Sequence, residues 1–176
     1  EWFIRPRQSG WPDSELIKKI VEQGCHLVKI PHPHSRNMET EYRFSFSVGE
    51  IELLHAMSDV QLDCFRFLRM LRNTEFPGAL TTYHMKTVFL WICEELPADI
   101  WCLEKVGKAY LLALEKLLHS LVEHNLPNYW IPSNNMLDHE DKEVLRNITL
   151  KVSKVRRSPL LYVENSSAAY LQLLTR

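Results

Sequence analysis

The chain has 176 residues, of which 45% are hydrophobic and 24% are charged, and its formal net charge at pH 7 is -1. This composition is too apolar for an intrinsically disordered segment and is sufficient for one folded domain with a hydrophobic core. The near-neutral charge excludes a strongly basic domain, so contact with a nucleic acid would have to come from a local patch.

The sequence also bears on the expected location. No run of roughly 20 consecutive apolar residues is present, so no membrane-spanning helix is predicted. The N-terminus lacks an initiator Met and a secretory signal pattern, which indicates a piece of a longer intracellular, cytoplasmic protein. The cysteines lie in or beside apolar segments without CxxC spacing, which predicts buried reduced thiols and no zinc knuckle for Cys25, Cys64, Cys93 and Cys102.

Residues 1–46 contain several prolines, one helical pattern from Asp13 to Gln23, and two β-prone runs at 25–30 and 42–46. Two short strands are marginally stable alone, so we expect them to complete a sheet whose other strands lie upstream. Between the runs, the prolines of residues 31–37 predict an exposed loop. Its two histidines, His32 and His34, have no third ligand nearby in sequence, so a metal site is not predicted.

Helical patterns dominate from Ser47 onward. Ser47 and Glu50 have capping-box spacing, which predicts a helix start at Ser47 with three residues facing inward, namely Ile51, Leu54 and Ala56. Ser58 and Gln61 repeat this spacing before a second apolar face, which comprises Val60, Cys64, Phe67, Leu68 and Leu71.

Further helical patterns complete the chain. A third helix is expected to begin after Thr81 and end before Pro97, and a fourth to cover 104–124, since Pro127 disfavours helix at the residue before it. Two more patterns lie at 137–154 and 166–176. The predicted fold is therefore mainly α, with about five to seven helices in a lobe over 47–176.

Several short motifs occur in a fixed order along the chain. They are Gly10-Trp11-Pro12, Leu27-Val28, residues 42–47 with Glu50, residues 81–87, and residues 126–132 with Asn135 and Leu137. Over about residues 10–155, this ordered set resembles the Mab-21 (male-abnormal) family, which includes the cyclic GMP-AMP synthases and similar receptors. The resemblance implies that 1–46 is the remnant of a nucleotidyltransferase core with a mixed sheet and that 47–176 is the helical lobe that closes the cleft.

The catalytic centre of that family lies in the upstream core, where a Gly-Ser motif accompanies three acidic residues that hold two divalent metals. No such pattern occurs in this sequence. We therefore expect no catalytic residue, metal or cofactor in this chain, and Mg or Mn with ATP or GTP only in an intact parent enzyme. The expected partners are the upstream core and a nucleotide.

The resemblance assigns nucleotide contacts to two short segments. Tyr83 matches a tyrosine that stacks on a base, a role tolerant of base identity, and Thr82 could donate to a phosphate or base. Arg43 matches a base-contacting arginine and would share one strand face with Ser45, while Phe44 and Phe46 enter the core. The alternatives are an amphipathic core position for Tyr83 and a surface salt bridge for Arg43.

Three further charged residues match the family. Glu50 matches an acidic residue near the nucleotide, although capping would also explain it. Arg69 matches a phosphate-contacting lysine, and it recurs with Arg66 and Arg72 at three-residue spacing; a solvated basic edge would give the same pattern. Lys86 is another candidate nucleotide contact.

A C-terminal basic cluster could grip the backbone of double-stranded nucleic acid. Its members, which helix-dipole effects alone would also favour at this place, are Lys151, Lys154, Arg156 and Arg157. Residues 54–59 pass directly across the point where vertebrate synthases carry a zinc insertion. This departure predicts no zinc site and argues against DNA sensing of the vertebrate kind.

The sequence leaves three functional hypotheses. The leading one is the nucleotide-facing helical lobe of a cyclic-dinucleotide synthase-like nucleotidyltransferase of the innate immune sensor type. The second is a catalytically inactive Mab-21 relative that acts as a protein-interaction or nucleotide-binding regulatory module. The third is an unrelated helical adaptor.

Overall fold

The computed structural model describes residues 1–30, 40–78 and 80–164. Its α-helices over these residues are α1 (Ser14–Gln23), α2 (Ser47–His55), α3 (Asp59–Glu75), α4 (Thr82–Glu95), α5 (Val106–Val122) and α6 (Lys142–Arg157). Two strands and three 3-10 turns accompany them: β1 (His26–Val28), β2 (Arg43–Ser45), η1 (Trp2–Ile4), η2 (Ala98–Ile100) and η3 (Leu103–Lys105). The prediction of a mainly helical fold with one helix and two short strands at its start is confirmed.

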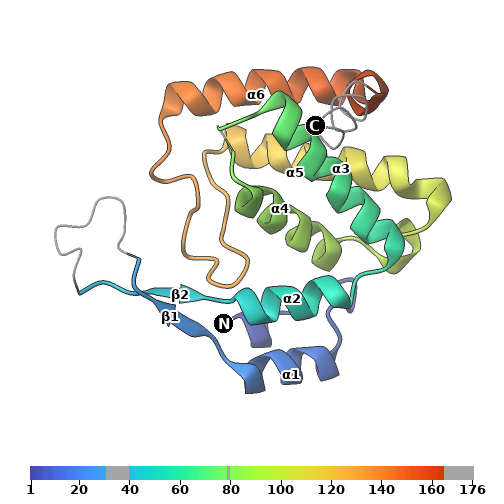
Figure 1. Cartoon of the computed structure of the whole chain (residues 1–176). Helices are drawn as coiled ribbons and strands as arrows, with labels where there is room; N and C mark the ends of the chain where they lie inside the picture. The colour runs from blue at the N-terminus through green and yellow to red at the C-terminus, as the bar shows by residue number, and fades with distance from the viewer. Residues whose placement is uncertain (31–39, 79, 165–176) are drawn as a thin grey trace, which may run out of the picture.

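The helices form stacked layers (Figure 1). α5 packs against α3, α4 and α6, while α1 packs against α2 at the base of the view. The loop between α5 and α6, drawn in orange, runs past the start of α4 toward β2 and α2. This loop therefore lies between the N-terminal elements and the rest of the helical lobe.

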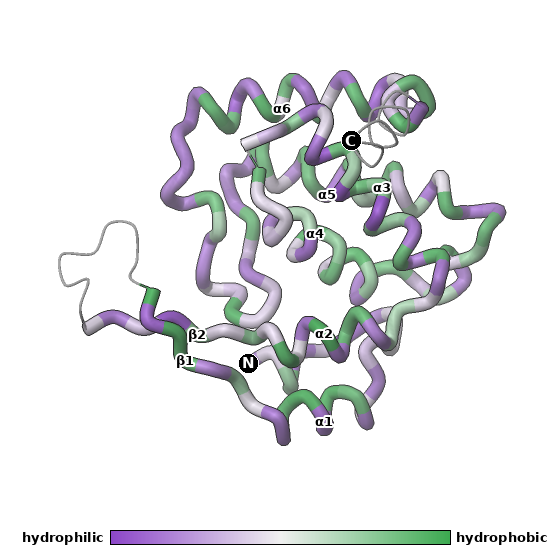
Figure 2. Tube along the Cα trace, in the orientation of Figure 1, coloured by the Kyte–Doolittle hydropathy of each residue, from purple (hydrophilic) through white to green (hydrophobic). Residues whose placement is uncertain are grey.

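Two helices show how the sequence sets burial. α4 buries Met85, Val88, Phe89 and Ile92, as expected for a helix covered on most sides. α6 is amphipathic and covers α5, so hydrophobic and hydrophilic residues alternate along it in Figure 2. Its buried residues recur at three- and four-residue spacing, at Leu145, Ile148, Val152 and Val155.

The helix starts agree with the sequence to within two residues except at α6, which begins at Lys142 after its N-cap Asp141 rather than at residue 137. Asp13 caps α1 by accepting from the amide of Leu16, and Ser58 and Gln61 form a capping box at α3. The predicted box at Ser47 is wrong. Phe46 is the N-cap of α2, without a side-chain cap bond, and the Glu50 amide donates to the Phe46 carbonyl at 2.9 Å. The Glu50 carboxylate is consequently free for another partner.

The predicted inward face of α2 is wrong for Ile51 and Ala56, which are exposed, and right for Leu54, which packs against the core. Ile51 is 51% exposed, whereas Gly49, Glu50 and Leu53 are buried. Apolar residues occur on both sides of this short helix, so periodicity alone does not determine which face of the helix is buried. Contact with α1 and with Trp130 determines the buried face instead, because the Gly49 backbone lies directly against Ile20 and Trp130.

The strands form an antiparallel ribbon in which Val28 pairs with Arg43 and Leu27 with Phe44. Phe46 stacks on Trp130 with ring centroids 5.0 Å apart, but Phe44 is 54% exposed. The expectation that both phenylalanines enter the core is therefore wrong for Phe44, because the paired Leu27 and Phe44 face away from the described core. Completion of an upstream sheet stays a prediction.

The cysteines split into two classes. Cys64 and Cys93 are buried, and burial raises the pKa of Cys64 to about 12. Cys25 is exposed and Cys102 is half-buried, so the prediction of burial is wrong for these two. All four are free thiols.

Two predicted segments, the 31–37 loop with His32 and His34 and the 166–176 helix, lie outside the described residues. Over the described ranges, every helix is too short or too polar to cross a membrane.

Candidate functional site

Predicted site residues from three elements meet around one tyrosine. Tyr83 and Lys86 lie on the first turns of α4, Glu50 comes from α2, and Arg43 lies on β2. Together with Asn128 of the α5–α6 loop, these residues form what we call the Tyr83 cluster. It lies where the N-terminal elements meet the helical lobe.

An ion pair joins the two helices of the Tyr83 cluster. Lys86 Nζ lies 2.6 Å from Glu50 Oε2, and their side chains are only 23% and 10% exposed. A partly desolvated, charge-assisted hydrogen bond is stronger than a surface pair, so this contact fixes α2 against α4. The predicted nucleotide contacts Glu50 and Lys86 thus pair with each other.

Tyr83 is half-buried, and Lys86 Nζ lies 5.9 Å from the centroid of its ring. Burial, followed by the neighbouring Glu50 carboxylate, raises the pKa of Tyr83 to about 12, while Asn128 and Arg43 act in the opposite direction. The side chain is therefore a neutral phenol near pH 7. A neutral hydroxyl can donate one hydrogen bond and accept others.

Asn128 connects this hydroxyl to the α5–α6 loop. Its Oδ1 accepts from the amides of Trp130 at 2.9 Å and Ile131 at 3.1 Å, and its Nδ2 donates to Tyr83 Oη at 3.4 Å. In the sequence, Asn128 is part of the motif at residues 126–132 but is not among the predicted site residues. An Asn just after a helix-ending proline is itself a signal for such a side-chain turn.

The α5–α6 loop is held by its own hydrogen bonds. Asn135 Oδ1 accepts from the amides of Leu126 and Leu137, at 2.9 and 3.0 Å. Trp91 Nε1 donates to the Pro127 carbonyl at 2.8 Å, which ties the loop to α4. Asn128 is thus presented to Tyr83 from a fixed backbone.

Other predicted nucleotide contacts lie at the edge of the Tyr83 cluster or apart from it. Thr82 is the exposed first residue of α4, and Ser45 is half-buried on β2, 3.4 Å from Ser47 between their hydroxyl oxygens. Arg69 lies on α3, with its guanidinium 5.9 Å from the Phe65 ring centroid, and none of its described interactions reaches the Tyr83 cluster.

The arginine ridge on α3 is largely engaged within the lobe. Arg66 pairs with Asp63 at 2.6 Å, and Arg72 Nε donates to the Leu80 carbonyl. These contacts match the alternative of a basic edge with local partners better than a continuous phosphate-binding surface.

The C-terminal basic cluster is divided between two flanks of α6. Lys151 donates to the Glu75 carbonyl at the end of α3, whereas Arg156 pairs with Glu115 on α5. Successive helical residues are about 100° apart, so five residues separate these two side chains by more than a third of a turn. Lys154 and Arg157 are exposed, and nucleic-acid binding by the cluster stays a prediction.

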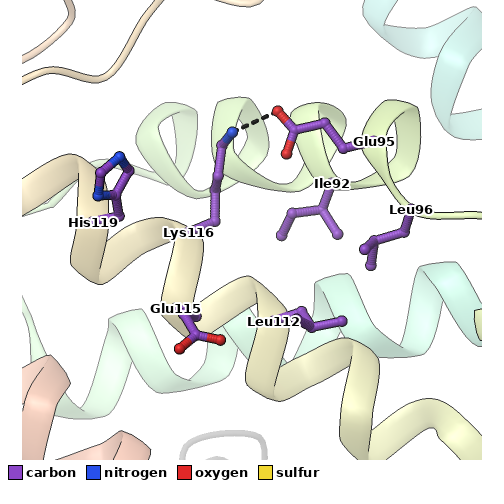
Figure 3. Close-up of a pocket in the computed structure, with 7 residues that line it drawn as sticks. All are labelled: Ile92, Glu95, Leu96, Leu112, Glu115, Lys116 and His119. Atoms are coloured by element: carbon purple, nitrogen blue, oxygen red, sulfur yellow. Dashed lines mark hydrogen bonds and ion pairs between the residues drawn. The ribbon is translucent and has the colours of Figure 1, made fainter. Parts of the chain in front are cut away.

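A groove of about 270 Å³ lies elsewhere, between α4 and α5. Figure 3 shows Ile92, Leu96 and Leu112 in this groove, with the Lys116–Glu95 ion pair at its side. It does not include the Tyr83 cluster. In the described part of the chain, no group of three or more His, Cys, Asp or Glu side chains is placed to hold a metal ion.

His84 caps the helix that carries Tyr83. Its Nδ1 accepts from the Thr81 amide and its own amide donates to Thr81 Oγ1, both at 3.2 Å. Burial lowers the pKa of His84, so the neutral ring that this cap needs is favoured in the fold. Glu140, His139 and Arg72 are the charged or titratable groups around it.

The cap predicts an acid-sensitive stability. The unfolded chain binds a proton at His84 more readily than the folded chain does, so the free energy of unfolding should fall as pH decreases below about 6.5. His84→Gln should flatten this slope, because Gln61 forms the same kind of box with Ser58. Urea unfolding across this pH range measures the effect; an unchanged slope in the variant would show that other groups cause it.

Comparison with known proteins finds a family match within the helical lobe. Residues 60–154, which cover most of α3 to α6, match the family described as Mab-21 protein HhH/H2TH-like domain. The chain belongs to the Mab-21 family. The resemblance found in the motifs is therefore confirmed, and Tyr83, Lys86 and Asn128 lie inside the matched segment.

Mab-21 relatives of two kinds are similar to this chain. A cyclic GMP-AMP synthase-like receptor of Aethina tumida is 30% identical over 155 residues, covering 86% of this chain and 38% of the relative. Protein mab-21-like 3 of Danio rerio is 27% identical over 162 residues, covering 87% and 39%. The chain thus spans about two fifths of the length of these relatives.

Proposed function

We propose that this chain is the nucleotide-facing helical lobe of a cyclic-dinucleotide synthase-like nucleotidyltransferase, with Tyr83 as the platform for a base. The observation that carries the proposal is the Tyr83 cluster, which fixes a half-buried aromatic ring at the junction of the lobe with the N-terminal elements. A relative named as a cyclic GMP-AMP synthase-like receptor, 30% identical, supports the same class of protein.

The chemistry of the Tyr83 cluster suits a nucleotide. Aromatic stacking on a base is tolerant of base identity, and it needs a ring whose orientation is set before binding. Arg43 is exposed beside the ring and can hydrogen-bond to a purine edge or a phosphate through its planar fork. In this proposal the paired Glu50 and Lys86 hold the ring, and Thr82 offers a hydroxyl at the helix start.

Phosphoryl transfer itself would belong to the rest of the parent protein. Two divalent metal ions, Mg or Mn, would there neutralise the charge that develops on the phosphates of ATP or GTP. This lobe would supply base stacking and orientation, which contribute to catalysis by positioning the reacting groups.

The proposal predicts a specific loss of nucleotide affinity. In the full-length protein that contains this chain, Tyr83→Ala should weaken binding of ATP or GTP with magnesium by about 5- to 150-fold, the usual value of stacking on one base. Tyr83→Phe retains the ring and should lose less. Isothermal titration calorimetry measures both affinities.

Two exposed cations provide a matched control for this experiment. Arg43→Ala removes a charge beside Tyr83 and should weaken binding, whereas Lys108→Ala removes an exposed charge from α5 and should not. Equal affinities for the native protein, Tyr83→Ala and Arg43→Ala would contradict the proposal.

One observation favours the inactive Mab-21 relative as the second candidate. Glu50 and Lys86 are already paired with each other, which leaves fewer free charges for a nucleotide. The similarity to protein mab-21-like 3 covers as much of the chain as the similarity to the receptor. A regulatory or protein-interaction module would keep its partner binding when Tyr83 is replaced by Ala.

A further inference from the structure

The α5–α6 loop contributes one side chain to the proposed base platform. We infer that Asn128 is a positioning residue, which sets the orientation of the Tyr83 ring before a nucleotide binds. The expected effect on nucleotide affinity rests on the proposed function. The orientation of Tyr83 by Asn128 concerns the free protein and does not depend on it.

The orientation of the Asn128 amide is fixed by its surroundings. Its Oδ1 accepts from the two backbone amides of Trp130 and Ile131. A flipped amide would place its NH2 group against these two N–H donors, so only one orientation satisfies the turn. In that orientation Nδ2 is the end that reaches Tyr83 Oη.

The direction of the next hydrogen bond follows. An amide NH2 group can only donate, so the Tyr83 hydroxyl oxygen accepts from Asn128. The hydroxyl proton is then available to the Glu50 carboxylate, which accepts only and acts on Tyr83 directly. Glu50 is in turn held by Lys86 at 2.6 Å. Tyr83 Oη thus accepts from the loop, and the Glu50 carboxylate of α2 is an acceptor near it.

The anchor is rigid at both ends. Asn128 is attached to a loop fixed by Asn135 and Trp91, and the adjacent Trp130 is 4% exposed. Contacts at the hydroxyl oppose rotation of the side chain about its Cα–Cβ bond, because that rotation would carry Oη away from Asn128. A ring already ordered in the free protein loses less conformational entropy on binding, which raises affinity without another contact to the ligand.

Asn128→Asp separates positioning from folding. The aspartate keeps an oxygen for the two backbone amides but has no donor for Tyr83, and it places a second acceptor near Glu50. We expect ATP or GTP affinity of the full-length protein to fall about 2- to 12-fold, the value of one lost hydrogen bond. Asn134→Asp is the matched control, since it adds the same charge to an exposed position of the same loop.

A double-mutant cycle and side-chain rotamer populations complete the test. In a Tyr83→Phe background, Asn128→Asp should have no further effect on affinity, because the hydroxyl that it orients is absent. In the free protein, NMR three-bond couplings should show that the population of the main χ1 rotamer of Tyr83 falls in Asn128→Asp and remains unchanged in Asn134→Asp.

The outcomes distinguish this inference from the proposed function. An unchanged χ1 rotamer population of Tyr83 in Asn128→Asp, or affinity losses that add in the cycle, would overturn the positioning role even if Tyr83→Ala abolished binding. If Tyr83→Ala has no effect on affinity, the base platform fails, and the χ1 rotamer populations alone decide whether Asn128 orients Tyr83.

Discussion

Glu94→Gln should lower the free energy of unfolding by about 3–5 kcal/mol, the usual cost of removing one partner from a buried ion pair. Glu94 is 4% exposed on α4, and its carboxylate receives Arg5 Nε at 2.5 Å and Arg5 Nη2 at 2.8 Å. Arg7 Nε lies 3.5 Å from the same carboxylate. The glutamine would leave two buried guanidinium groups without an anion.

The large expected effect depends on how fully Arg5 is enclosed. Its guanidinium lies over the rings of Trp91 and Tyr129, 4.1 and 4.8 Å from their centroids, and Nη1 donates to the Tyr129 carbonyl. Little solvent can replace the lost carboxylate at this place. This contact and the bond from the Ser9 amide to the Glu94 carbonyl hold the N-terminal segment to α4, so losing the carboxylate should loosen the segment.

The neighbouring residue supplies the control. Glu95 is exposed and pairs with Lys116 at the surface, so Glu95→Gln should cost less than about 1 kcal/mol. Urea unfolding followed by far-UV circular dichroism compares the two variants. Similar losses for both would mean that the Arg5–Glu94 contact contributes no more than a surface pair.

Gly49→Ala should destabilise the protein although alanine is the better helix former. A Cβ at this position would lie 2.7 Å from Trp130 Cη2 and 3.0 Å from Ile20 Cγ2. Trp130 is confined by its contacts with Trp2 and Phe46, so α2 would have to move. Overpacking of this kind destabilises more than the better helix propensity of alanine stabilises, so the free energy of unfolding should fall by about 1–2 kcal/mol.

The same substitution at Gly107 should have the opposite effect on the free energy of unfolding. Gly107 lies near the start of α5, where an added Cβ meets nothing within 4 Å, so Gly107→Ala should be neutral or stabilise by up to about 1 kcal/mol. Comparing the thermal and urea unfolding of Gly49→Ala and Gly107→Ala isolates the contribution of the close approach of α2 to Trp130. Stabilisation by Gly49→Ala would show that this approach imposes no constraint.

Gly49 also links packing to the proposed site. It directly precedes Glu50, whose carboxylate holds Lys86 and acts on Tyr83. A shift of α2 away from Trp130 would therefore move one side of the Tyr83 cluster relative to α4. Close packing at Gly49 and hydrogen bonding at Asn128 therefore both support the cluster through the α5–α6 loop.

The sequence by itself determined the helical lobe and its family. Local signals suffice for α1, α3 and α4, because each cap, such as Ser58 with Gln61, satisfies backbone donors within a few residues. The amphipathic spacing of α6 likewise predicts which of its residues meet the core. The ordered motifs were enough to indicate the Mab-21 family, which the matched segment confirms.

Tertiary contacts decided what these local rules leave open. Which face of α2 was buried depended on Trp130, more than 70 residues away in the chain. The partners of Glu50, Glu94 and Tyr83 are also distant, namely Lys86, Arg5 and Asn128. Charges and amides can pair with any of many similar groups, and only the packing of the elements selects the group within reach.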